Sequence, residues 1–113
     1  MPVKLAALKE ALRDGLHVDN LDRMIGLCTD LLNEGGPRVP LFVFRSCLQY
    51  LHYRKADTPV VAGAIESADR KFVETASRLL DALSGGGSGT DLLPLLDELV
   101  GRVLSLPASY SSG

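Results

Sequence analysis

Apolar residues recur every three or four positions along most of this chain, and this period constrains its fold more than any other feature. From Leu21 to Leu32 they fall at the spacing i, i+3, i+4 and i+7, which places side chains on one face of an α-helix. We therefore predict an all-α fold, a bundle of four to five helices. The first four helices are expected at about residues 2–14, 20–34, 40–55 and 58–83.

Glycine, proline and capping residues mark where these helices begin and end. The second helix is expected to have Asp19 or Asn20 as its N-cap, because both side chains accept hydrogen bonds from free backbone N–H groups. The glycines at 35–36 end it, since Gly adopts the left-handed conformation that commonly closes a helix. The fourth helix is expected to start with Thr58 as N-cap and Pro59 in its first turn.

The segment 39–44, VPLFVF, has the β-branched and aromatic character of a strand. Pro40, however, suits the first turn of a helix, and Leu41, Phe44 and Leu48 continue a helical stripe. The chain offers no second strand for this segment to pair with. We therefore predict a helix here.

Composition limits the class of protein. The 113 residues suffice for one compact domain, and 46% hydrophobic with 23% charged residues is typical of a globular chain. A net charge of -2 gives no basis for direct nucleic-acid binding. No apolar run is long enough for a membrane span, so we expect a soluble intracellular protein without membrane contact.

Two cysteines and two histidines are the residues that would first suggest a metal site. Cys28 and Cys47 lie among apolar residues at helical spacing, which favours reduced core thiols. Together with His17 and His52 they could supply four zinc ligands, but no C-x-x-C or H-x-x-x-H pair pre-organises a site. No residue is spaced to complete a catalytic relay with either histidine. The sequence therefore predicts no metal, no cofactor and no enzymatic activity.

Glycine and serine dominate the segment SGGGSG, which ends at Gly89 and has no side chain able to pack. It divides the chain into a helical protein-interaction domain at 1–84, a Gly/Ser linker at 85–89 that resembles an engineered one, and a tethered amphipathic helix with a disordered tail at 90–113. The alternative is a natural glycine loop. A phosphate-binding loop is excluded because the Lys that such a loop needs after its glycines is missing.

The helix after the linker is strongly apolar and cannot be stable alone. Thr90 is its expected N-cap. A short apolar helix on a flexible tether is typical of a ligand laid into a hydrophobic groove, although a fifth core helix of one natural domain has the same pattern. The residues expected to pack as a ligand helix are Leu92, Leu95, Leu96, Leu99, Val100 and Val103.

Two stretches, at 8–32 and 47–83, resemble the N-terminal helical domain of transcription elongation factor TFIIS. Within that superfamily the integrase-binding domain of lens epithelium-derived growth factor is the most similar. The most specific piece is the connector L-H-V-D-N-L-D at 16–22, where that subfamily carries a Lys, an aliphatic residue and then Asp-Asn-Leu-Asp.

The resemblance implies a right-handed helical bundle that works in the nucleus as a docking scaffold for transcription or chromatin proteins. It implies a site at one end of the bundle, where an Asp accepts backbone N–H bonds of a disordered ligand and apolar neighbours take the ligand's hydrophobic side chains. Independently of the family, Asp19 could be only an N-cap and Val18 its hydrophobic staple. The partner-binding residues implied here are Val18, Asp19, Tyr53, Arg54, Lys55 and Ala56.

These observations predict a non-enzymatic docking module that binds a short linear motif or an amphipathic helix of a transcription or chromatin protein, with segment 90–113 as its tethered ligand. The alternative is a natural five-helix structural or oligomerisation domain whose last helix completes the core.

Overall fold

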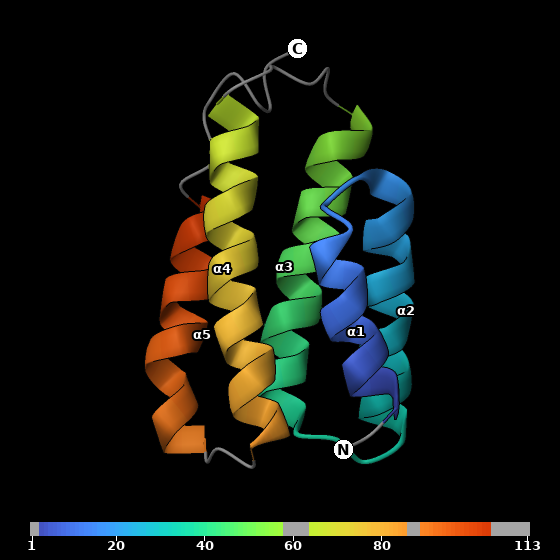
Figure 1. Cartoon of the computed structure of the whole chain (residues 1–113), viewed down its shortest axis with the longest axis vertical. Helices are drawn as coiled ribbons and strands as arrows, with labels where there is room; N and C mark the ends of the chain where they lie inside the picture. Colours follow the sequence, from blue (N-terminus) through green and yellow to red (C-terminus); the bar gives the residue numbers. More distant parts are fainter. Residues whose placement is uncertain (1–2, 58–63, 86–88, 105–113) are drawn as a thin grey trace.

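The described part of the chain forms five α-helices, which run alternately up and down along the long axis of the molecule (Figure 1). The computed structural model describes residues 3–57, 64–85 and 89–104. The predicted all-α bundle is confirmed. The helices are α1 Val3–Arg13, α2 Val18–Asn33, α3 Arg38–Asp57, α4 Ala64–Ser84 and α5 Gly89–Leu104.

The helices close into a ring in the order α1, α2, α3, α5 and α4, with α4 returning to α1. α5 therefore packs on both α3 and α4, and Figure 1 shows it at one edge of the bundle beside α4. None of the helices in the described part is long and apolar enough to cross a membrane.

One hydrophobic core runs through the whole bundle. Each helix contributes side chains that are completely buried. Burying a Leu or Phe side chain contributes roughly 1.5–3 kcal/mol, so the core outweighs any single polar contact. Fully buried representatives of the five helices are Leu8, Leu21, Phe44, Leu79 and Leu99.

The segment 39–44 is helical, as predicted, and its strand-like composition has a structural reason. α3 carries apolar residues on two faces. Leu41 and Phe44 point into the core, and the Phe44 ring stacks on Phe72 of α4 with centroids 6.3 Å apart. Phe42 is instead 41% exposed. A helix that is apolar on opposite faces loses the one-sided pattern by which helices are usually recognised.

The end of α2 is closed by the two glycines, as expected. Gly35 has a φ of +87°, in the left-handed region, and the backbone N–H of Gly36 donates to the carbonyl of Leu31 at 2.9 Å. Both features belong to the Schellman type of helix end. The predicted cap at Thr58 and Pro59 lies outside the described residues.

We predict that Gly36→Ala destabilises the fold and that Gly26→Ala stabilises it. A Cβ at position 36 would lie 2.9 Å from the Leu31 carbonyl oxygen and from Leu41 Cδ1, an overlap that should cost about 1–3 kcal/mol. Gly26 lies exposed within α2, where an added Cβ would meet nothing within 4 Å, and Ala is favoured over Gly there by about 0.5–1 kcal/mol. Urea denaturation measures both changes, and equal effects of the two variants would contradict this packing.

Candidate functional site

The connector between α1 and α2 turns sharply at a glycine. Gly15 has a φ of +101°, which glycine adopts without strain. His17 is the N-cap of α2, and its Nδ1 accepts a hydrogen bond from the backbone N–H of Asn20 at 3.3 Å. The prediction that Asp19 or Asn20 caps this helix is therefore wrong, because α2 begins earlier, at Val18.

Asn20 holds the connector from inside the bundle. It is only 5% exposed, and its Nδ2 donates to the backbone carbonyls of Ala11 and Gly15, both at 2.6 Å. The Ala11 carbonyl also accepts the backbone N–H of Asp14 at 3.0 Å, and Gly15 lies beyond the end of α1. The Asn20 amide therefore joins the last turn of α1 and the connector to the start of α2. Sequence reasoning missed this role, although Asn20 lies four residues before the buried Met24, on the apolar stripe of α2.

The two connector residues of the predicted site lie in the first turn of α2. Asp19 is exposed, and its carboxylate makes no hydrogen bond with the residues the structure describes. Because His17 caps the helix, Asp19 is not the cap and its oxygens face solvent. Val18 is half-buried beside it. An exposed carboxylate here is compatible with the positive end of the helix dipole and with backbone N–H groups of a ligand.

The other half of the predicted site lies at the end of α3, on the same end of the bundle as the connector (Figure 1). His52 Nε2 lies 3.3 Å from Asp22 Oδ1, which joins α3 to the first turns of α2. Tyr53 is 63% exposed. Arg54 Nη1 donates to the Tyr50 hydroxyl at 2.5 Å. The side chains of Lys55 and Ala56 lie outside the described residues.

The predicted ligand helix packs on the bundle through most of its stripe. α5 begins one residue before the expected cap, at Gly89. Leu95 is half-buried, while Val100 lies at the edge with 36% of its surface exposed. A tethered ligand and a fifth core helix would both show this pattern. The buried members of the stripe are Leu92, Leu96, Leu99 and Val103.

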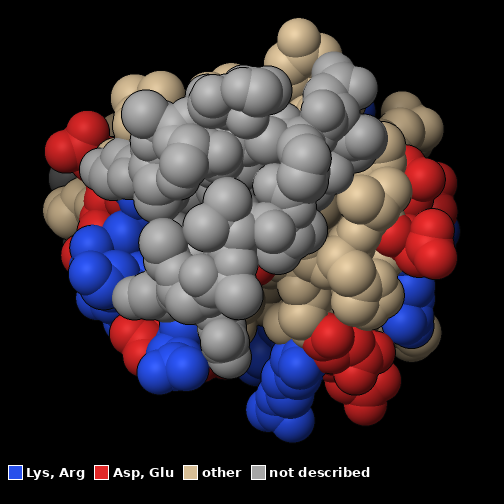
Figure 2. Space-filling view, turned by 90° about the horizontal axis from the view of Figure 1, so that it is seen from above, with Lys and Arg blue, Asp and Glu red and all other residues tan. Residues whose placement is uncertain are grey.

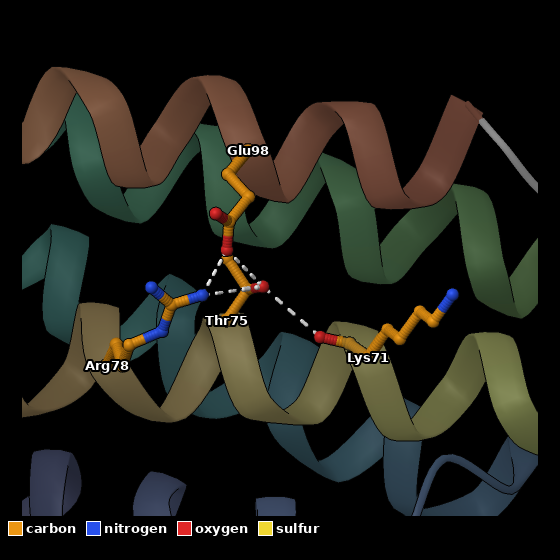
Figure 3. A network of polar contacts seen from close by, with 4 residues as sticks. All are labelled: Lys71, Thr75, Arg78 and Glu98. Atoms are coloured by element: carbon orange, nitrogen blue, oxygen red, sulfur yellow. Dashed lines mark hydrogen bonds and ion pairs between the residues drawn. The ribbon is translucent and has the colours of Figure 1, made fainter.

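A polar network joins α4 to α5 within this apolar contact (Figure 3). Thr75 is completely buried, and its hydroxyl donates to Glu98 Oε2 at 2.7 Å. The same hydroxyl oxygen lies 3.1 Å from the Lys71 carbonyl oxygen. The hydroxyl has only one proton to donate, and the charged carboxylate of Glu98 is the stronger acceptor of the two. The Arg78 guanidinium forms an ion pair with the same carboxylate oxygen. The network therefore fixes how α5 is positioned along α4.

The environment of Glu98 favours its ionised form. The hydrogen bond from Thr75, followed by the positive charges of Arg78 and Arg102, holds the pKa of the Glu98 carboxyl below its usual range. Sequence reasoning missed this pair because Thr75 and Glu98 are far apart along the chain. The available signal was a threonine within the apolar stripe of α4, next to Phe72 and Ala76.

An apolar groove lies between α3 and α5. Its volume is about 320 Å³, and among the described residues that line it Ser46 alone has a side chain that is neither apolar, aromatic nor a thiol. The lining side chains are Phe42, Val43, Ser46, Cys47, Tyr50, Val100, Val103 and Leu104.

Arginines cover the aromatic rings at the edges of this groove. The Arg38 and Arg45 guanidinium carbons lie 5.7 and 4.9 Å from the centre of the Phe42 ring. Arg54 lies 5.3 Å from the centre of the Tyr50 ring. Each is within the distance of a cation–π contact. The groove therefore has an apolar floor and positive edges on α3.

Charge elsewhere on the surface is mixed. Seen from above, Lys and Arg alternate with Asp and Glu around the rim of the molecule (Figure 2). The part of the rim that this view shows therefore carries charges of both signs.

Both thiols are buried and unpaired, as expected for core cysteines. Burial raises the pKa of the Cys28 thiol to about 12 and that of Cys47 to about 11. Both therefore stay protonated at neutral pH and are poor nucleophiles there. Among the described residues, no three His, Cys, Asp or Glu side chains are grouped to hold a metal ion.

Comparison with protein-family models, with curated proteins and with solved structures finds no match to this chain. The resemblance to the TFIIS N-terminal domain therefore rests on the residues of the connector and the helices that carry it.

We predict that the Glu98 contact makes stability depend on pH at the acidic end. A carboxyl whose folded-state pKa lies below the unfolded value stabilises the fold above about pH 4.5 and loses this effect as the pH falls through the folded pKa. Glu98→Gln should therefore be less stable than the parent at pH 7, with the difference shrinking as the pH approaches 3. Thermal melting across this range measures it. Asp97→Asn, on the exposed side of α5, is the control, and an identical pH profile for both variants would contradict the network's role.

Proposed function

We propose that this chain is a non-enzymatic docking module that binds short disordered or helical segments of partner proteins. The assignment to transcription or chromatin adaptors, and to the nucleus, follows from the sequence resemblance. The docking activity itself has support in the outward face of α3. That face exposes apolar and aromatic side chains, whereas the solvent-facing side of a surface helix usually carries polar residues.

The observation that carries the proposal is the line of exposed apolar and aromatic side chains along α3. Val39 is 62% exposed, Phe42 41%, Tyr50 37% and Tyr53 63%. They recur at helical spacing and therefore share one face. Contiguous exposed apolar groups mark interaction surfaces, and tyrosine suits them because its ring packs while its hydroxyl stays hydrated.

One end of this line meets the site implied by the resemblance. Tyr53 lies beside His52, which contacts Asp22 near the start of α2. Asp19 and Val18 occupy the preceding turn of α2. We assign Asp19 to accept backbone N–H groups of the bound segment, and Val18 and Tyr53 to pack against its apolar side chains. Arg54, Lys55 and Ala56 complete the proposed site on the α3 side.

We predict that segments selected from a display library of short peptides bind this end and depend on Asp19. Asp19→Asn should weaken them about ten- to a hundredfold, since a hydrogen bond to a charged group contributes roughly 1.5–3 kcal/mol. Stability should change little, because His17 and not Asp19 caps α2. Calorimetry measures affinity, and amide shifts in NMR spectra locate the contact.

Asp30→Asn, on the exposed surface of α2, is the matched control and should leave binding unchanged. Failure of the library to yield any binder that contacts a continuous surface would overturn the docking function. Binders that contact this end but ignore Asp19→Asn would remove Asp19 from the site and leave docking in place.

For segment 90–113 we propose the role of a tethered ligand helix. A second candidate, a five-helix structural domain, is favoured by one observation. The buried residues of α5 belong to the same core as those of the other four helices, and Thr75 of α4 directs its buried hydroxyl to Glu98 of α5.

Leu99→Asp separates these two candidates. Leu99 is fully buried, so its replacement by a charged group removes several kcal/mol from the packing of α5. For a tethered ligand, amide hydrogen exchange should show loss of protection in α5 while α1 to α4 stay protected. Leu93→Asp is the control, because Leu93 is 58% exposed on the same helix. Cooperative loss of protection in all five helices would favour the structural domain.

A further inference from the structure

We propose that the groove between α3 and α5 binds an acidic amphipathic helix of a partner protein. This inference rests on the docking function proposed above and specifies a second surface and the chemistry of its ligand. It concerns the long side of the bundle, whereas Asp19 lies at its end. Four observations support the inference: the lining of the groove, the length of the exposed face of α3, the charge at the edges of the groove, and the symmetry that a second copy of the chain would impose.

The lining of the groove can accommodate apolar side chains. Its floor is made of Val43, Cys47 and Val103, and Val100 and Leu104 form the wall on α5. Leu104 is 73% exposed and Val100 36%, so this wall is open to solvent along the described part of α5. A ligand that covers these groups removes apolar surface from water, which is the main source of affinity in helix-in-groove binding.

The length of the exposed face fits a helix of about four turns. From Val39 to Tyr53 the axis of α3 rises by roughly 20 Å. A ligand helix of about 15 residues spans this distance and presents apolar side chains at i, i+3, i+4 and i+7. The exposed Leu93 of α5 extends the apolar surface toward the start of that helix.

The charge at the edges selects for acidic residues. α3 carries Arg38, Arg45 and Arg54 and has no Asp or Glu before Asp57. Among the described residues neither Arg38 nor Arg45 forms an ion pair; Arg38 is exposed, whereas Arg45 is half-buried and its Nη1 donates to the Thr29 hydroxyl at 3.2 Å. A guanidinium laid over an aromatic ring keeps N–H groups at its edge for a carboxylate, which it can bind in bidentate fashion. Carboxylates on the flank of an apolar stripe that faces α3 therefore match this face.

A second copy of the chain matches it poorly. In a two-fold symmetric dimer the same patch meets itself, so the arginine-bearing face of α3 would meet an identical arginine-bearing face. Like charges brought together across an interface cost free energy and favour other partners. The net charge of -2 does not change this, because the repulsion is between local groups. The observations thus favour a different, acidic protein segment.

The probe for the test is a synthetic helical peptide of about 15 residues with Leu and Phe on one stripe and Glu at the flanking positions. Its counterpart has Lys in place of every Glu. Fluorescence anisotropy with the full chain should show binding of the acidic peptide, at least tenfold weaker binding of the basic one, and loss of affinity with added salt.

Two matched pairs of variants locate the contact. Ser46 lines the groove and is exposed. Ser46→Glu should therefore lower the affinity for the acidic peptide about tenfold, while Ser46→Lys should not lower it. Arg38→Glu should lower the affinity for the acidic peptide about fivefold. Arg70→Glu, an equal charge change on the exposed surface of α4, should leave this affinity unchanged. All these positions are at the surface, and circular dichroism verifies that the fold is retained.

Equal binding of the two peptides would overturn the inference, since the groove would then be apolar without charge selection. Sensitivity to Arg70→Glu would overturn it by moving the contact to α4. Self-association of the chain that Ser46→Glu abolishes, seen by sedimentation, would assign the groove to a second copy. Absence of binding here, with library segments still bound at Asp19, would remove this surface and leave the docking function intact.

Discussion

Burial of the leucine stripe of α5 is the contact on which the closed bundle depends. α3 and α4 are in contact through the Phe44–Phe72 ring pair, and α5 packs along both helices. Leu92, Leu96 and Leu99 fill the space where these helices meet, and the Thr75–Glu98 hydrogen bond adds a directional contact in the same interface. Apolar burial provides most of the free energy, whereas a buried polar pair has defined geometry and so favours one register over its neighbours.

The structure depends secondly on the residue composition of α3, because this helix packs on the core with one face and meets solvent with the other. Its inner face packs against α2, α5 and the Phe72 ring, and its outer face keeps Phe42, Tyr50 and Tyr53 in contact with solvent. Arg38 and Arg45 cover part of the Phe42 ring and so shield some of its apolar surface. Arginine is suited to this because its flat guanidinium stacks on a ring while its charge stays hydrated. The protein thus exposes aromatic groups that a ligand can cover.

Sequence reasoning predicted the features that depend on local period and on glycine. The helix at 39–44 followed from the stripe that continues to Leu48, and the end of α2 followed from the glycines at 35–36. It could not predict contacts between residues that are distant in the chain. Asn20 is a residue type that often caps helices, but here its amide donates to the carbonyls of Ala11 in α1 and Gly15 in the connector, so its role depends on how α1 and α2 are packed.

The candidate site was harder to predict for the same reason. The resemblance predicts a site that includes Asp19 in the first turn of α2 and Tyr53 near the end of α3, and these two helix ends lie at the same end of the bundle (Figure 1). The sequence predicts Cys47 as a core thiol and Val103 as a residue of the ligand stripe, but it does not predict that they line one groove. The groove is a property of two helices together, since neither α3 nor α5 alone encloses it. Its edge charges lie on α3 and one of its walls on α5, so a periodicity search within a single helix does not reveal it.

Formation of the groove is therefore coupled to docking of α5 on the bundle. This holds whether α5 is a tethered ligand helix or the fifth helix of one domain. Val100, Val103 and Leu104 line the groove only while α5 is docked between α3 and α4. A ligand that contacts the α5 side of the groove binds the protein only when α5 is docked. By linkage, the ligand stabilises the docked position of α5 by the difference between its binding free energies for the two states. Conversely, a competitor that displaces α5 from α4 removes the groove. In a tethered-ligand protein this would make one binding event depend on the other, and in a five-helix domain the same coupling would be part of global stability.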